Sequence, residues 1–244
     1  MKLAYSGEIQ HCMGELDQLI QDSLKPWWGQ VLPHVDRLSS DIHYYTLPLA
    51  ALAACIVQGV DRARALSMAN IFRTLYLSNH IHSQIRDEAE GQLCDQQMQH
   101  DMLLSDYIFG HLIQSLLDIQ AEELLDDFSL LMCRLNEAFT REHLGTDETT
   151  TIAQSKTDYY ITAFRTAARL GEDRDIEGFA EIGALFGQVL NHRDMDCESA
   201  VQYGSAMGEL LRELGQRRRE AVLRLGKLRK DLFPDELLFT AANA

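Results

Sequence analysis

The chain has 244 residues, of which 46% are hydrophobic, and a formal net charge of −15 at pH 7. So acidic a chain lacks the positive patches that displace phosphate counterions, and we expect no nucleic-acid partner. It contains no run of 18 or more apolar residues and no apolar segment of a secretory signal, so we predict a cytoplasmic protein without a transmembrane segment.

Apolar residues recur at helical spacing along most of the chain, and no strand pair joined by a hairpin turn is visible. We therefore predict an all-α fold in a single domain, residues 1–244, with about eight to ten helices. In chain order, the predicted helices cover residues 9–24, 48–57, 62–85, 97–119, 122–143, a segment that ends at 170, 175–193 and 201–232.

Proline and glycine set the predicted breaks. Pro26, Gly29 and Pro33 interrupt the apolar period after the first helix, so no helix is expected there. Pro48 is assigned to the first turn of the second helix, where its missing N–H has no partner to lose. The polar residues 146–151 are predicted to form a loop.

Trp27 and Trp28 are adjacent in the broken segment. Two neighbouring side chains cannot share one face of a helix, so we expect one of the two indole rings to be exposed. Exposed Trp is enriched in protein interfaces, which makes this pair a candidate contact with another protein. An exposed ring without an interface role is the plainer alternative.

The predicted helix 62–85 ends in a segment rich in histidine and acid, LSNHIHSQIRDEAE at 77–90. His80 and His82 are two residues apart and point in very different directions on a helix, so we expect a polar helix end rather than a metal site. The acidic residues after them are most simply a solvated cluster.

This segment resembles the first aspartate-rich helix end of the trans-prenyltransferases, the polyprenyl diphosphate synthases. In that family a helix ends in His followed by DDxxD. Here Ser83, Gln84 and Asp87 fall on the three aspartate positions, so two of the three carboxylates are absent.

Three further segments resemble the same family in the same order. They are MLLSDYIFG at 102–110, SKTDYYITAFRTAARLGE at 155–172 and EIGALFGQVLNHRDMDCE at 181–198. The last resembles the second aspartate-rich helix, with Gly183 and Gly187 at its two small positions. Together the four segments imply an isoprenoid-synthase-type helical bundle around a central cavity.

The family ionises an allylic diphosphate with Mg²⁺ ions that its two aspartate motifs hold, because Mg²⁺ prefers carboxylate and phosphate oxygens. The second motif here keeps Asp194, whereas Met195 and Glu198 occupy its other two positions. We therefore predict a degenerate site with no catalytic residue, no bound metal and no cofactor. Lys156 matches a lysine that binds phosphate in the family and is the candidate substrate-binding residue; an ordinary surface lysine is the plainer alternative.

The resemblance implies a non-catalytic subunit, a pseudoenzyme. Its partner would be a DDxxD polyprenyl diphosphate synthase subunit, in a heterodimer that makes long-chain prenyl diphosphate for quinone side chains such as that of menaquinone. One alternative is a divergent but active Mg²⁺-dependent synthase or terpene-type lyase that uses Asp87, Asp194 and Glu198. Another is a dimer of this chain with itself that binds a prenyl chain.

Overall fold

The computed structural model describes residues 7–85, 96–143, 148–171 and 175–192, and all regular elements in these ranges are helices. The predicted all-α class is therefore confirmed. The elements are α1 (Gly7–Ser23), α2 (Trp28–Arg37), the 3-10 helix η1 (Leu38–Ser40), α3 (Ile42–Val57), α4 (Arg62–Ser83), α5 (Gln96–Asp118), the 3-10 helix η2 (Glu122–Leu124), α6 (Leu125–His143), α7 (Glu148–Leu170) and α8 (Ile176–His192).

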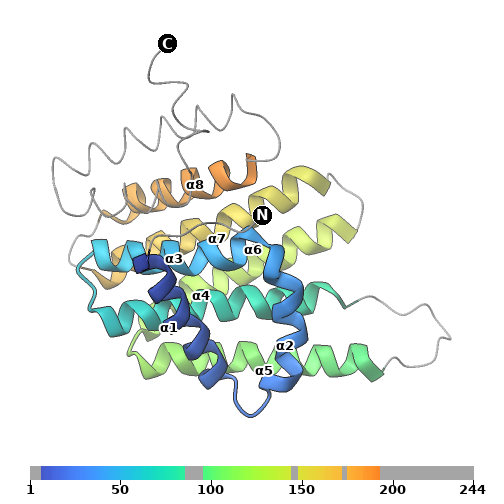
Figure 1. Ribbon diagram of the computed structural model, residues 1–244. Helices are drawn as coiled ribbons and strands as arrows, with labels where there is room; N and C mark the ends of the chain where they lie inside the picture. Colours follow the sequence, from blue (N-terminus) through green and yellow to red (C-terminus); the bar gives the residue numbers. More distant parts are fainter. Residues whose placement is uncertain (1–6, 86–95, 144–147, 172–174, 193–244) are drawn as a thin grey trace.

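The long helices pack as a series from α5 to α8. Helix α4 lies between α3 and α5, and α7 packs against α3, α6 and α8. Figure 1 shows this order, with α8 at one end of the series, α5 at the other, and α1 and α2 crossing one side of it. The apolar faces of these helices meet in one continuous core.

Helix α3 begins six residues before Pro48, so our prediction that Pro48 stands in the first helical turn is wrong. Asp41 caps the helix, because its side chain accepts a hydrogen bond from the backbone N–H of His43 at 2.8 Å. A proline inside a helix removes one backbone hydrogen bond. Here Pro48 itself and most of its neighbours on α3 are buried, and that packing stabilises the helix.

The segment after α1 also differs from the prediction, because α2 is helical from Trp28 to Arg37 with Pro33 inside it. Pro33 is exposed, so water can bond the carbonyl that its ring leaves without a donor. Val31 and His34 are buried and hold the helix to the bundle. Tertiary packing has overridden the local signal of proline and glycine.

Two further predictions concern the later part of the chain. Helix α7 begins at Glu148, inside the loop predicted for residues 146–151. The helix predicted for residues 201–232 lies outside the described residues.

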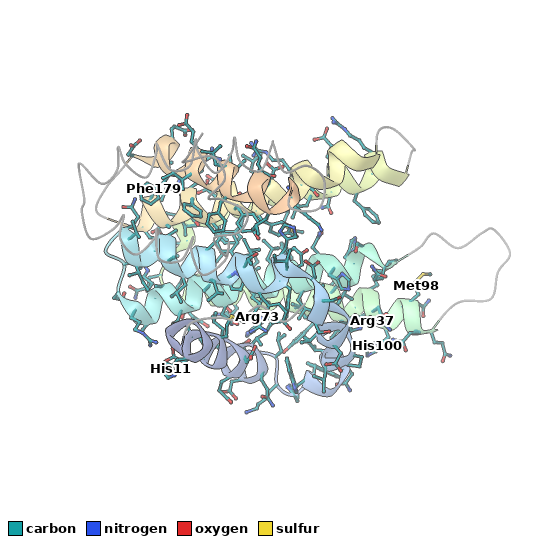
Figure 2. All side chains as sticks on the ribbon, turned by 45° about the horizontal axis from the view of Figure 1, so that its top comes forward. His11, Arg37, Arg73, Met98, His100 and Phe179 are labelled. Atoms are coloured by element: carbon teal, nitrogen blue, oxygen red, sulfur yellow. The ribbon has the colours of Figure 1, made fainter. Side chains whose placement is uncertain are left out.

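The buried side chain of Arg73 links helix α1 to the rest of the bundle. The side chain of Arg73 on α4 is 2% exposed, and its Nη2 lies 2.6 Å from a carboxylate oxygen of Asp17 on α1. Its guanidinium also stacks over the ring of Tyr44, 4.6 Å from the ring centre. Figure 2 labels Arg73 where α4 faces α1. One charged side chain thus joins α1, α3 and α4.

Two glycines bring α8 close to α7. A Cβ atom on Gly183 would lie 2.4 Å from the backbone oxygen of Tyr160, and one on Gly187 would lie 2.8 Å from Cα of Thr157. Only a residue without a side chain fits at either position. A hydrogen bond also joins the two helices, because the side-chain amide of Asn191 donates to Oγ1 of Thr157 at 2.9 Å.

No single described helix is both long and apolar enough to cross a bilayer. Among the described residues, the pair Trp28–Ser40 and Ile42–Val57 together reaches that length and composition, and these two stretches are bent by 94° with respect to each other.

Candidate functional site

A cavity of about 260 Å³ lies where the C-terminal half of α4 meets α6 and α7. One wall is polar and comes mainly from α4 and α7. The other is apolar and comes from α6. The lining residues are Asp41, Tyr76, Asn79, His80, Ser83, Leu135, Ala138, Phe139, Ser155, Lys156 and Tyr159.

The helical period explains which side chains reach the cavity. On α4, Tyr76, His80 and Ser83 are four and three residues apart, so they share one face of the helix. On α7, Ser155 and Tyr159 are one turn apart and likewise share a face. The cavity thus lies between the C-terminal half of α4 and the N-terminal half of α7.

Asp41 is the one carboxylate among these lining residues, and both of its oxygens accept hydrogen bonds. One oxygen caps α3 through the backbone N–H of His43, and the other accepts from the hydroxyl of Tyr76 at 2.8 Å. Burial, and next the negative charge of Asp41, raise the pKa of Tyr76 well above its usual value. Tyr76 therefore remains a hydrogen-bond donor at neutral pH.

A buried polar cluster links α3 to α7 near the cavity. The hydroxyl of Tyr160 lies 2.6 Å from Oγ1 of Thr46 and 3.0 Å from Nδ1 of His43. Burial, and next the positive charge of Lys156, lower the pKa of His43 to about 4, although Asp41 opposes the shift. His43 is therefore neutral at pH 7 and serves as a hydrogen-bonding group of the core.

Lys156 is the cationic residue of the cavity lining, and its side chain is partly exposed. It forms no ion pair with any residue that the structure describes. Its charge nevertheless acts inside the protein, because it lowers the pKa of His43. The structure thus places the predicted substrate-binding lysine at a cavity wall, where its ammonium group can meet a polar or anionic ligand.

The first degenerate motif lies only in part within the described residues. Ser83 lines the cavity, and its hydroxyl donates to the backbone oxygen of His80 at 2.8 Å. Gln84 follows the end of α4 and is exposed. Asp87 of this motif, and Asp194, Met195 and Glu198 of the second motif, lie outside the described residues, so their roles stay predictions.

The two histidines of the motif have different surroundings. His80 lines the cavity, its Nε2 is buried without a hydrogen bond to any described residue, and burial lowers its pKa. His82 is exposed, and its Nδ1 lies 3.5 Å from the hydroxyl of Ser105 on α5. The pair therefore does not converge on one point.

The described cavity does not fit the Mg²⁺ cluster of the family. Its lining offers the single carboxylate of Asp41, whose oxygens already accept two hydrogen bonds. Within the described ranges, no group of three or more His, Cys, Asp or Glu side chains is placed to hold a metal ion. These residues can position a polar group through Lys156 and Tyr76, but they cannot supply the carboxylates that a diphosphate–metal clamp requires.

Our sequence analysis missed several cavity residues. Asp41 follows two serines and precedes an apolar run, which is an N-cap signal seven residues before Pro48. Tyr76 and Asn79 lie one helical turn before the His pair, so the period of α4 could have found them. Nothing in the sequence indicated that Phe139 of α6 forms the opposite wall.

No protein-family model and no curated protein matches the sequence. Solved structures do match. A mint deletion mutant of heterotetrameric geranyl pyrophosphate synthase in complex with ligands is 13% identical and superimposes with a TM-score of 0.65, over 91% of this chain and 99% of that chain. The geranyl diphosphate synthase small subunit from Antirrhinum majus is 12% identical, with a TM-score of 0.67 over 92% and 96% of the two chains.

At these identities the similarity establishes the fold. The chain has the all-α fold of trans-prenyltransferase-like proteins, the isoprenoid-synthase type, and the predicted fold is confirmed. The matched regions cover almost the whole length of both neighbours.

Proposed function

We propose that this chain is a non-catalytic, prenyltransferase-like subunit that assembles with a catalytic subunit bearing DDxxD motifs. The complex would make a long-chain prenyl diphosphate for a quinone side chain, and the chain by itself would need no metal or cofactor. The proposal rests above all on one observation, the lining of the cavity, in which Lys156 is accompanied by a single carboxylate, that of Asp41, among the described residues.

The residues that line the cavity support a chain that keeps the helical framework of the family without its metal chemistry. Ionisation of an allylic diphosphate needs several carboxylates around Mg²⁺. Ser83 stands at one position where the family has an aspartate, and Asp41 is engaged in capping α3. By contrast, the apolar core and the close contact of α7 with α8 are intact.

The names of the structural neighbours support a role in a complex. One is described as part of a heterotetrameric geranyl pyrophosphate synthase and the other as a small subunit of a geranyl diphosphate synthase. The quinone side chain as destination rests on the family resemblance alone.

An activity assay with and without a partner tests the proposal. Purified chain is incubated with farnesyl diphosphate, isopentenyl diphosphate and Mg²⁺, alone and with the DDxxD synthase subunit from the same genome. We expect no product from the chain alone, and a changed rate or product length in the mixture. Product from the chain alone would instead favour the divergent active synthase, with Asp87, Asp194 and Glu198 as the ligands to test next.

A further inference from the structure

The polar wall of the cavity carries one positive and one negative charge among its described residues. Lys156 supplies the ammonium group and Asp41 the carboxylate. His80 adds no charge at pH 7, because burial lowers its pKa. The two charges are not equally available to a ligand. Both oxygens of Asp41 already accept hydrogen bonds, whereas Lys156 forms no ion pair with a described residue.

This balance limits the charge that the cavity can accept. A buried ion needs an opposite charge and hydrogen bonds to offset its desolvation. A phosphate monoester carries a charge of about −1.5 to −2 at pH 7, so it would place excess negative charge beside Asp41. A carboxylate carries a single charge, which the ammonium group of Lys156 can pair. The described lining therefore favours a ligand with one negative charge.

Side chains of α4 add neutral donors to this wall. Nε2 of His80 is buried without a hydrogen bond to a described residue, and such unsatisfied groups are rare in folded proteins. Asn79 precedes His80 and lines the same cavity, and its amide offers two N–H groups. A carboxylate has two oxygens with about four acceptor positions. It can therefore use the ammonium group and both neutral side chains at the same time.

The opposite wall fits an apolar body. Leu135, Ala138 and Phe139 are three and four residues apart on α6, so they share one face of the helix. The rings of Tyr76 and Tyr159, with 5.2 Å between their centres, border the same space. The volume of about 260 Å³ lies below the range of about 300–1,000 Å³ that is usual for drug-sized ligands. The shape and lining thus fit a small molecule with one polar and one apolar end.

We propose that this cavity binds a small apolar carboxylic acid, as its carboxylate and without a metal ion. The ammonium group of Lys156 pairs with the carboxylate, Asn79 and His80 donate to its oxygens, and the hydrocarbon part lies against α6. This inference goes beyond the proposed function, because it gives the chain a ligand of its own that does not depend on a synthase partner.

Isothermal titration calorimetry of the full chain at pH 7 tests the site. Octanoate carries the carboxylate, octan-1-ol the same chain without a charge, octyl phosphate a larger charge, and inorganic pyrophosphate with Mg²⁺ the charge without the hydrocarbon. Lys156→Gln removes the ammonium group, and Ala138→Trp fills the cavity from its apolar wall. Arg165→Gln, on a partly exposed arginine further along α7, is the matched control for loss of a positive charge. Thermal unfolding of each variant shows whether it is folded.

We expect octanoate to bind at least about tenfold more tightly than octan-1-ol or octyl phosphate, because a hydrogen bond to a charged group exceeds the ~1.4 kcal/mol of a tenfold change. Lys156→Gln should remove most of the preference over the alcohol, Ala138→Trp should abolish binding of both, and Arg165→Gln should change neither. If Ala138→Trp does not fold, the preference for octanoate and its loss in Lys156→Gln still decide the question.

Equal binding of octanoate and octan-1-ol, or no binding of octanoate, overturns the inference. Octanoate binding that ignores Ala138→Trp places the ligand elsewhere and also overturns it. Tighter binding of octyl phosphate, or binding of pyrophosphate with Mg²⁺, would show that the site accepts more than one negative charge, which contradicts the proposed ligand class. None of these results decides the assay with the synthase partner, so the proposed function is tested separately.

Discussion

The C-terminal half of α7 packs one face into the core, whereas the N-terminal half of the helix borders the cavity. Tyr160, Phe164 and Ala167 are buried against α3 and α8. Ser155 and Lys156, one to two turns earlier, are partly exposed at the cavity wall. The same helix therefore serves as a core element at one end and as a site element at the other.

The two ends of α7 differ in how strongly packing limits the residue type at each position. In the packed half, a single added carbon atom at Gly183 would collide with the backbone of α7. At the cavity, Ser83 and Lys156 are only partly buried, so a change of side chain there disturbs little packing. Substitutions at the packed end should therefore cost more stability than substitutions at the cavity wall, and the following experiments test that difference.

The largest effect is expected from Gly183→Val. Its side chain would press on the backbone oxygen of Tyr160, which cannot move aside by changing rotamer. We expect the free energy of unfolding to fall by about 3 kcal/mol or more, at the upper end of overpacking costs. The measurement is the midpoint and slope of urea unfolding followed by circular dichroism.

Gly14→Ala on α1 is the matched control, because a Cβ atom there meets nothing within 4 Å. Replacing an exposed helical glycine by alanine should raise stability by about 0.5–1 kcal/mol. If Gly183→Val were as well tolerated as Gly14→Ala, the close packing of α7 on α8 would not be what holds this half of the molecule.

The second effect is a dependence of stability on pH that comes from His43. Its pKa is lowered to about 4 in the folded protein, from the ordinary histidine value of about 6.5, chiefly by burial. The unfolded chain therefore binds more protons between these values, and stability is complete above the upper one and declines as the pH falls toward the lower one. From about pH 7 to about pH 5 the loss from this group is about 2 kcal/mol.

His43→Gln isolates this contribution, since the other titrating groups remain. The loss of stability on acidification should shrink by about 2 kcal/mol relative to the wild type. His82→Gln, at an exposed position, is the control for removal of a histidine. An unchanged pH dependence in His43→Gln would show that this imidazole is not held neutral by the core.

The same contrast explains what the sequence could predict. Most helices follow from the spacing of apolar residues, because burial against the core imposes that period. The errors fall at Pro33 and Pro48, where a local signal suggested a break. Pro33 is exposed, so water can compensate for the lost hydrogen bond, and around Pro48 the burial of most of α3 does so.

The site was only partly predictable. The family resemblance indicated Ser83 and Lys156, and both line the cavity. The capping role of Asp41 depends on where α3 begins, which was misjudged. The wall from α6 depends on how α6 packs against α7, and no local pattern encodes such a long-range contact.

A smaller effect separates the two tyrosines that bond across helices. Tyr160→Phe leaves His43 and Thr46 without their shared partner inside the core, and the cost should be about 1–2 kcal/mol. Tyr76→Phe removes a hydrogen bond to Asp41 at the cavity, where water can replace the hydroxyl, so we expect about 0.5–1 kcal/mol. Urea unfolding of both variants gives the comparison, and equal losses would mean that the cavity wall is as dry as the core.

The smallest change in stability is expected at Lys156. Because its side chain is partly exposed and forms no ion pair with a described residue, Lys156→Gln should change the free energy of unfolding by less than about 0.5 kcal/mol. The substitution should nevertheless raise the pKa of His43, because the ammonium charge contributes to its lowering. NMR titration of the His43 ring protons measures this shift, with Arg165→Gln, on a partly exposed arginine further along α7, as the control. A His43 pKa that does not move would mean that solvent screens the lysine. A rise would show that the ammonium group of Lys156 sets the local potential at the cavity wall, where Asp41 is the carboxylate among the described lining residues.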